Sequence, residues 1–103
     1  MELLQLQYFR KVAQLENITL AARHFYISQP ALSKTIKSLE DELGVKLFER
    51  RGRNIYLNEY GKIFLQKVEH ALDDLEEGKR ELKDMSKNFF GRISFAIFVA
   101  SNI

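Results

Sequence analysis

The first half of the chain places its apolar residues with the period of helices that bury one face. Steps of three and four residues around Phe9 predict a helix over residues 3–15. A second, short helix is predicted to run to about residue 25. Asn17 or Thr19 can begin it, because a side-chain oxygen at that position accepts a backbone N–H that has no partner within the helix.

A third helix is predicted between Ser28 and Gly44. Ser28 is a good N-cap, and Pro30 falls in the first turn, where its missing N–H removes no hydrogen bond. Gly44 can end the helix because glycine readily adopts the left-handed backbone of a C-terminal cap. One narrow stripe of this helix is apolar and must face a core, and it consists of Leu32, Ile36, Leu39 and Leu43.

The opposite face of this third helix is small, hydroxyl-bearing and basic. It carries Pro30, Ser33, Lys34 and Lys37. A short helix and a tight connection precede it, which is typical of a helix-turn-helix whose second helix enters the major groove of DNA. Helical periodicity alone supports a solvated amphipathic face equally well.

After Gly44 the pattern changes to two short strand-like runs, residues 47–50 and 54–57. The segment Arg51-Gly52-Arg53 joins them, and a glycine in so short a connection indicates a β-hairpin. Arginine side chains at a hairpin tip suit the narrow minor groove of DNA, where the negative potential is enhanced. A helix-turn-helix followed by a basic hairpin is a winged helix, although a tip that is merely soluble also accounts for these residues.

Asn58 can cap a long helix predicted from Glu59 to about Lys87. Its apolar positions advance by alternating steps of four and three, the spacing of a heptad seam that packs against another helix. The candidate dimerisation residues are Phe64, Val68, Ala71, Leu75, Leu82 and Met85, with Gly78 in the same series. The alternative is that Tyr60 and the first half of the stripe pack against the chain's own first half, which leaves the later residues uncovered.

The composition is that of one small globular domain with an appended element. The chain has 103 residues, of which 46% are hydrophobic and 29% charged. It contains no cysteine, which excludes a disulfide framework, a thiolate zinc site and a cysteine nucleophile. Charges interrupt the N-terminal segment too early for a signal peptide, and no apolar run is long enough to span a membrane. We therefore expect a soluble cytoplasmic protein without a membrane partner.

The basic excess lies in the first half of the chain. Residues 1–57 carry nine Lys and Arg against six Asp and Glu, whereas residues 58–88 carry six against eight. A small basic patch often only solvates a surface, so charge by itself supports nucleic-acid binding weakly.

Residues with catalytic or metal-binding spacing are not apparent in the sequence. His24 and His70 lie far apart and have no partner at ligand spacing. The chain has no glycine-rich phosphate loop, no paired carboxylates and no nucleophile next to a base. We predict no catalytic residue, no metal site and no enzyme. Two other classes stay open at this point: a helical dimerisation or scaffold module without DNA binding, and an accessory subunit of an enzyme.

Several short motifs carry a resemblance to a known family. They are Thr19-Leu-Ala-Ala, Ser28-Gln-Pro-Ala-Leu-Ser33, Leu43-Gly44 with Leu47-Phe48, and Leu57-Asn-Glu-Tyr-Gly61. Residues 2 to about 87 resemble the N-terminal domain of LysR-type transcriptional regulators. The resemblance implies a mainly α fold: a winged helix-turn-helix with a two-stranded wing over residues 1–58, then a long linker helix over residues 59–88 that pairs two subunits antiparallel.

The resemblance also implies roles for individual residues. Gln29, Pro30, Ser33 and Lys34 would approach base edges and phosphates, Thr19 would hold the DNA backbone, and Arg53 would approach the minor groove. Leu20 departs from the family pattern, in which a polar residue is usual. Together with the face and hairpin described above, the candidate DNA-binding residues are Thr19, Ser28, Gln29, Pro30, Ser33, Lys34, Lys37, Arg50, Arg51 and Arg53.

The last segment, residues 89–103, alternates with Ile93, Phe95, Ile97 and Val99 on one side, which predicts a strand from Gly91. It resembles the first strand of the family's effector-binding domain, in a truncated form. Members of the family bind a small-molecule co-inducer in that domain, so we expect no cofactor in this fragment. The implied partners are double-stranded operator DNA and a second copy of the chain, or a tetramer for the longer protein, in the bacterial cytoplasm at the nucleoid.

Overall fold

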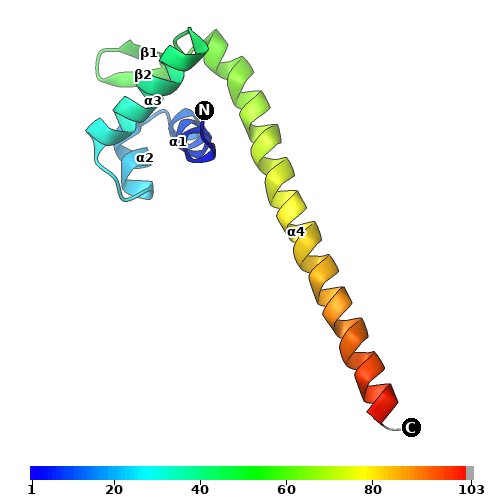
Figure 1. Cartoon of the computed structure of the whole chain (residues 1–103). Helices are drawn as coiled ribbons and strands as arrows, with labels where there is room; N and C mark the ends of the chain where they lie inside the picture. The colour runs from blue at the N-terminus through cyan, green and yellow to red at the C-terminus, as the bar shows by residue number, and fades with distance from the viewer. Residues whose placement is uncertain (102–103) are drawn as a thin grey trace. The chain divides into compact units, whose positions relative to one another are not determined.

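The computed structural model describes the backbone of residues 1–101 and the side chains of that range other than those of residues 89, 90 and 94. The elements in chain order are α1 (Leu3–Leu15), α2 (Ile18–His24), α3 (Gln29–Leu43), β1 (Phe48–Arg51), β2 (Asn54–Leu57) and α4 (Glu59–Ser101) (Figure 1). The chain divides into two compact units, Met1–His70 and the segment from Ala71 onward. We call Met1–His70 the head.

The helix ends in the head form where the sequence predicts them. The Asn17 side chain accepts a hydrogen bond from the backbone N–H of Leu20 at 3.0 Å, so Asn17 and not Thr19 caps α2. The hydroxyl of Ser28 accepts one from the backbone N–H of Ala31 at 3.2 Å and caps α3. Gly44 ends α3 with φ of 77°, the left-handed conformation that glycine tolerates best.

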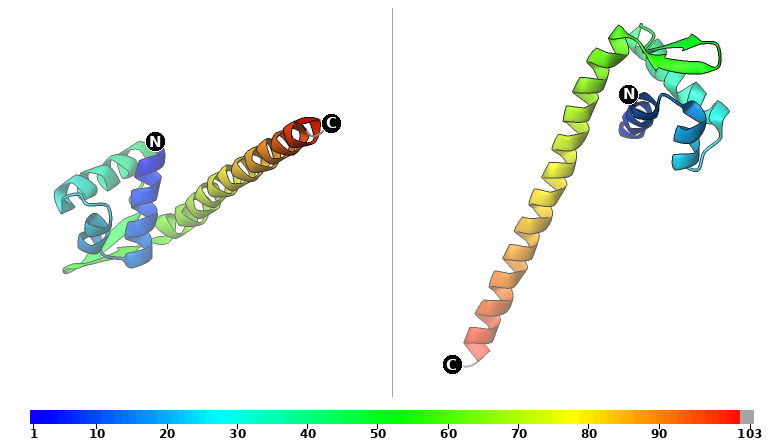
Figure 2. Two further views of the ribbon diagram at one scale, coloured as in Figure 1. Left: turned by 90° about the horizontal axis from the view of Figure 1, so that it is seen from below. Right: turned by 180° about the vertical axis from the view of Figure 1, so that it is seen from behind.

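The core of the head lies between the first three helices, each of which packs against the other two. Figures 1 and 2 show α1, α2 and α3 gathered into one cluster with the hairpin at its side. The apolar stripe of α3 is confirmed as a core face, since Leu32, Ile36 and Leu39 are buried. The largest fully buried side chains are Phe9, Val12, Leu32, Leu39 and Leu47.

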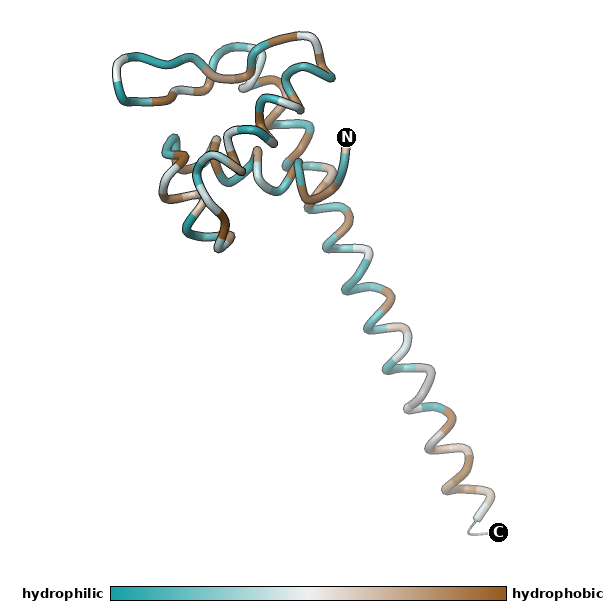
Figure 3. Tube along the Cα trace, turned by 60° about the vertical axis from the view of Figure 1, so that its left-hand side comes forward, coloured by the Kyte–Doolittle hydropathy of each residue, from teal (hydrophilic) through white to brown (hydrophobic). Residues whose placement is uncertain are grey.

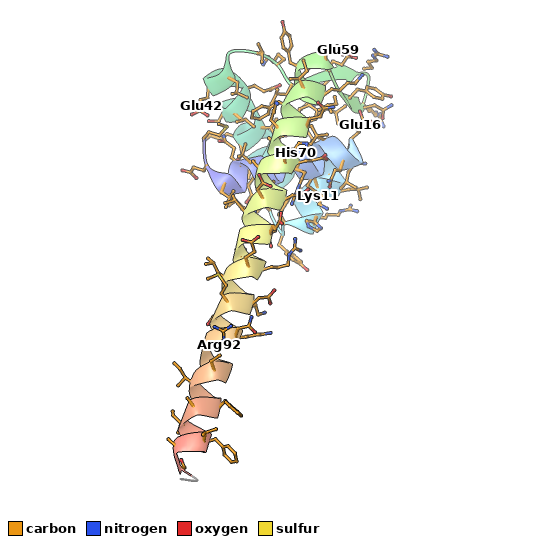
Figure 4. All side chains as sticks on the ribbon, turned by 90° about the vertical axis from the view of Figure 1, so that its right-hand side faces the viewer. Lys11, Glu16, Glu42, Glu59, His70 and Arg92 are labelled. Atoms are coloured by element: carbon orange, nitrogen blue, oxygen red, sulfur yellow. The ribbon has the colours of Figure 1, made fainter. Side chains whose placement is uncertain are left out.

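The predicted hairpin is confirmed, and its first strand begins one residue later than expected, at Phe48. The strands pair antiparallel, with Arg50 opposite Ile55. Two carboxylates tie the hairpin to the helices. Buried Glu40 accepts a hydrogen bond from the backbone N–H of Leu47 at 2.7 Å. Glu16, labelled in Figure 4, accepts one from the backbone N–H of Leu57 at 3.0 Å.

The head continues past residue 58, because the first turns of α4 pack into it. The Asn58 side chain caps α4 by accepting from the backbone N–H of Gly61 at 2.8 Å. The ring of Phe64 lies 5.3 Å from that of Phe9, and Val68 is only 3% exposed. Val68 is therefore covered by the core of its own chain and Phe64 is half-buried against Phe9, while the dimerisation role of both residues stays a prediction.

The predicted strand from Gly91 is also wrong, since α4 continues as one helix to Ser101. A helix pairs its own N–H and C=O groups, whereas a strand needs a neighbouring strand for that purpose. The strands within residues 1–101 are β1 and β2, and these pair with each other. In the same range no helix is long and apolar enough to cross a membrane.

Gly61 is the glycine whose position most restricts substitution. A Cβ added there would press directly against the carbonyl oxygen of Leu47 and the side chain of Leu57. We expect Gly61→Ala to lower the free energy of unfolding by about 1–3 kcal/mol, measured by urea denaturation. Gly78→Ala is the matched control, because a Cβ there meets nothing within 4 Å and alanine favours the helix. Equal stability of the Gly61 variant and the native chain would contradict this close approach.

Candidate nucleic-acid interface

The N-terminal half of α3 presents the polar face that the sequence predicts. Pro30, Lys34 and Lys37 are exposed and Ser33 is half-buried, while the apolar stripe on the other side faces the core. Because the core fixes the rotation of α3, these four side chains stay on the outer surface of the head.

A groove of about 540 Å³ separates α3 from the hairpin β1–β2, which we call the wing. Its basic side chains are Lys34 and Lys37 from α3, Lys46 from the loop before the wing, and Arg50 from β1. Its apolar side chains are Ile18, Ile36, Phe48 and Ile55. The groove is therefore an apolar trough with ammonium and guanidinium groups along it.

Strand alternation decides which wing residues line this groove. Successive side chains of a strand point to opposite faces, so Phe48 and Arg50 of β1 share one side, and Lys46 reaches the same side from the loop before β1. All three line the groove, together with Ile55, the partner of Arg50 in the hairpin register.

A second hollow of about 210 Å³ adjoins the first and shares Ile18, Arg50 and Ile55 with it. It is lined in addition by Glu16, Asn17, Thr19, Gln29, Arg53 and Asn54. Thr19 Oγ1 donates a hydrogen bond to Gln29 Oε1 at 3.2 Å, which links the first turns of α2 and α3 at this hollow.

The two hollows bring together seven of the ten candidate DNA-binding residues. These seven are Thr19, Gln29, Ser33, Lys34, Lys37, Arg50 and Arg53. Pro30 is exposed in the first turn of α3, and the hydroxyl of Ser28 serves as the N-cap of that helix.

Arg51 differs from the other basic candidates. It forms an ion pair with Glu49 at 2.7 Å, and its guanidinium carbon lies 5.4 Å from the centre of the Tyr56 ring. These contacts hold it on the side of β1 away from Arg50. Within residues 1–101, no ion pair occupies the basic side chains of the two hollows, namely Lys34, Lys37, Lys46, Arg50 and Arg53.

Sequence analysis missed Lys46 and Asn54 as residues of this surface. Their positions in the sequence could have indicated both. Lys46 comes four residues before Arg50, just ahead of the first predicted strand, and Asn54 is the first residue after the hairpin tip. In the described part of the chain, no group of three or more His, Cys, Asp or Glu residues is placed to hold a metal ion.

Comparison with known proteins gives the family context of this surface. Residues 3–62 match the sequence pattern of the bacterial regulatory helix-turn-helix proteins of the lysR family. The chain is 46% identical over 94 residues to the uncharacterized HTH-type transcriptional regulator YybE of Bacillus subtilis (strain 168), covering 91% of this chain and 32% of that protein. It thus spans about a third of the length of that curated relative.

Solved structures match the fold closely. The BenM DNA-binding domain in complex with catB site 1 DNA has a TM-score of 0.79 and 35% identity, covering 84% of this chain and 96% of that chain. The CbnR DNA-binding domain in complex with DNA has a TM-score of 0.77 and 34% identity, covering 84% and 99%. The matches extend over the winged helix-turn-helix architecture and into the long helix.

Proposed function

The chain belongs to the lysR family of bacterial regulatory helix-turn-helix proteins, and we propose that it is a transcriptional regulator that binds specific sequences of double-stranded DNA. The observation that carries this proposal is that α3 and the wing border one groove, which carries the basic side chains of Lys34, Lys37, Lys46 and Arg50. A helix of this kind fits the major groove, and an arginine at the wing tip suits the minor groove.

Within this surface, we assign reading and positioning to different residues. Pro30, Ser33 and Lys34 lie on the outer face of α3, where side chains reach base edges. Lys46, Arg50 and Arg53 lie beside or on the wing, where guanidinium and ammonium groups attract phosphates and the minor groove. The DNA-binding domains of BenM and CbnR, to which this chain is similar, were solved as complexes with DNA, which supports DNA binding by the head.

We further propose that the functional form is a homodimer paired through α4, with an antiparallel arrangement. Leu75, Leu82 and Met85 are 52%, 68% and 66% exposed in the single chain, and a second copy would cover them. When one head of a dimer is bound to DNA, the linked second head is present at high effective concentration near the second half-site. A modest basic surface on each head is then enough for useful affinity. DNA binding by this part of the chain requires no cofactor in our proposal, and its place of action is the bacterial cytoplasm.

An electrophoretic mobility assay on random-sequence duplexes tests the proposal against a scaffold module that only dimerises. The regulator should shift duplex DNA at low salt and lose affinity steeply as salt rises, because bound phosphates release counterions. A dimerising scaffold would sediment as a dimer and leave the duplex unshifted at every salt concentration.

We expect the wing mainly to contact phosphates and so to position the head on the DNA. The salt dependence of DNA affinity measures the number of such contacts. We expect Lys46→Gln and Arg53→Gln each to reduce the slope of the logarithm of the binding constant against the logarithm of the salt concentration by about 0.9 per bound protomer. Each substitution removes one cation that neutralises a phosphate. Arg51→Gln should change this slope less, because Arg51 is held by Glu49 and Tyr56.

Lys62→Gln is the control for these variants, because Lys62 lies in the first turns of α4 and pairs with Glu59 at 3.0 Å. Slopes equal to the native value in the Lys46 and Arg53 variants would mean that the wing does not touch DNA.

A further inference from the structure

Glu16 ends α1 in a backbone conformation that glutamate rarely adopts. Its φ of 48° and ψ of 41° are left-handed, and its backbone N–H donates to the carbonyl oxygen of Val12 at 2.7 Å. Glycine is the usual residue at such a helix end, because the backbone crowds a side chain there. Within residues 1–101, only Glu16 and Tyr26 combine a positive φ with a side chain. A glutamate at this position therefore lowers the stability of the head relative to glycine.

The charge of Glu16 is also unfavourable for the proposed function. Its side chain lines the hollow of about 210 Å³ together with Arg50 and Arg53, on the surface that we propose to face DNA. A carboxylate there repels phosphates. Within the described part of the chain, Glu16 forms an ion pair with neither arginine. Since backbone and charge both disfavour a glutamate here, its benefit has to come from another contact.

That contact is a hydrogen bond to the wing. Glu16 Oε2 accepts from the backbone N–H of Leu57 at 3.0 Å. The next residue, Asn58, donates its own backbone N–H to the carbonyl oxygen of Leu47, on the side of β1. Because successive N–H groups of a strand point to opposite sides, the N–H of Leu57 points away from β1. Glu16 therefore joins the end of α1 to the outer edge of β2.

The other directional contact at the base of the wing holds β1. Glu40 of α3 accepts from the backbone N–H of Leu47 just before β1, and the ring of Phe48 packs against α1. The tip, residues 51–53, is exposed, and Figure 3 shows it as a hydrophilic loop that projects from the helices. A two-stranded ribbon held along one strand can roll about that strand. The apolar burial of Ile55 in β2 opposes the roll weakly because it fixes no direction, whereas a hydrogen bond does.

We propose that Glu16 is a positioning residue for DNA binding, which holds the wing at the angle to α3 at which Arg50 and Arg53 reach phosphates. This inference rests on the proposed function and adds to it a residue outside both α3 and the wing. A wing that is held before DNA arrives removes part of the ordering cost of binding. The head gives up some stability for this fixed wing, as functional sites do when they retain backbone strain.

Two uncharged variants separate the hydrogen bond from the charge. Glu16→Gln keeps the length of the side chain and an oxygen that accepts from Leu57, whereas Glu16→Gly relieves the backbone and removes the contact. In the mobility assay we expect Glu16→Gly to bind random-sequence duplex at least about 5-fold more weakly than Glu16→Gln, the change that one hydrogen bond typically gives. Its midpoint of urea denaturation should be no lower than that of Glu16→Gln, because the strain is gone. A purely structural role would lower affinity and stability together.

Glu16→Asn controls for the backbone freedom that glycine introduces. Asparagine tolerates the left-handed conformation, but its side chain is one methylene shorter than that of glutamine and falls short of the Leu57 N–H. We therefore expect Glu16→Asn to bind duplex DNA as weakly as Glu16→Gly. An affinity equal to that of Glu16→Gln in either variant would overturn the inference.

A double-mutant cycle shows whether Glu16 acts through the wing. Arg53→Gln should weaken DNA binding less in the Glu16→Gly chain than in the Glu16→Gln chain, because a wing that rolls has already lost part of its phosphate contact. Lys37→Gln is the control, since Lys37 lies on α3 and its loss should weaken binding equally in both chains. Equal effects of Arg53→Gln in the two chains would show that Glu16 does not act on the wing.

Spin labels report the position of the wing without DNA, and the native chain has no cysteine that would compete for them. Ser38→Cys on α3 and Asn54→Cys on the wing are exposed labelling sites, used in labelled chain diluted with unlabelled chain. We expect a narrow distance distribution with the native Glu16 and with Glu16→Gln, and a broader one with Glu16→Gly.

The outcomes separate this inference from the proposed function. Equal widths of the distance distribution would overturn the positioning of the wing, whether or not the chain binds DNA. A broader distribution with unchanged DNA affinity would overturn the role of Glu16 in binding and leave the proposed function intact. A native chain that leaves the duplex unshifted would overturn the proposed function itself.

Discussion

The chain with Leu75→Asp and Leu82→Asp should be monomeric and should bind operator DNA about 100-fold more weakly or worse. Both residues lie in the seam of α4 outside the head, and a carboxylate there cannot be buried against a second helix without a large desolvation cost. Loss of the dimer removes the effective concentration that links two half-sites. Sedimentation velocity gives the oligomeric state, and a mobility assay on an operator duplex gives the affinity.

The matched control for this variant is Lys83→Gln with Lys87→Gln. It changes the net charge by the same amount, but the two lysines do not belong to the heptad seam. We expect the control to stay dimeric, and both variants to keep a folded head by circular dichroism. A double aspartate variant that still sediments as a dimer, or a monomer with undiminished affinity, would contradict pairing through α4.

Replacing Pro30, Ser33 and Lys34 together by alanine should abolish sequence selection while the chain still binds DNA at low salt. A side chain that reads a base edge supplies about 1–3 kcal/mol of discrimination, so the ratio of operator to random affinity should fall at least about 100-fold. The wing cations that attract phosphates remain in this variant. Competition between labelled operator and unlabelled random duplex measures the ratio.

Ser38→Ala is the control for this triple variant. Ser38 is exposed on α3 but lines a different hollow, between α3 and the start of α1. It should leave the ratio unchanged. If the folded triple variant selects the same sequences as the native chain, α3 does not read the DNA.

The local sequence predicted most of the head because its helix ends are specified by single residues. The bounds of α1 and α3 agree with the sequence prediction, and the caps Ser28 and Gly44 account for those of α3. The rotation of α3 could also be predicted, since its apolar stripe leaves one face for the core. Which residue caps α2 could not be decided locally, because Asn17 and Thr19 both carry a suitable oxygen.

The features that the sequence could not predict depend on contacts between distant parts of the chain. Phe64 fits a heptad spacing, but whether it pairs with another helix or packs against Phe9 is a property of the folded head. Residues 91–101 alternate as in a strand but have no second strand to pair with among the described residues, and their backbone N–H and C=O groups pair within a helix instead. Lys46 was missed because its place in the groove arises from the packing of the wing against α3.

The measurement that tests the central claim most directly is selection of bound sequences from a pool of random duplex DNA with the native chain. Our account predicts enrichment of a single motif with two half-sites related by dyad symmetry, because each head of a two-fold dimer reads one half-site through α3. Rounds of selection that bind DNA yet enrich no motif, or that recover no DNA at all, would contradict sequence-specific recognition by this chain.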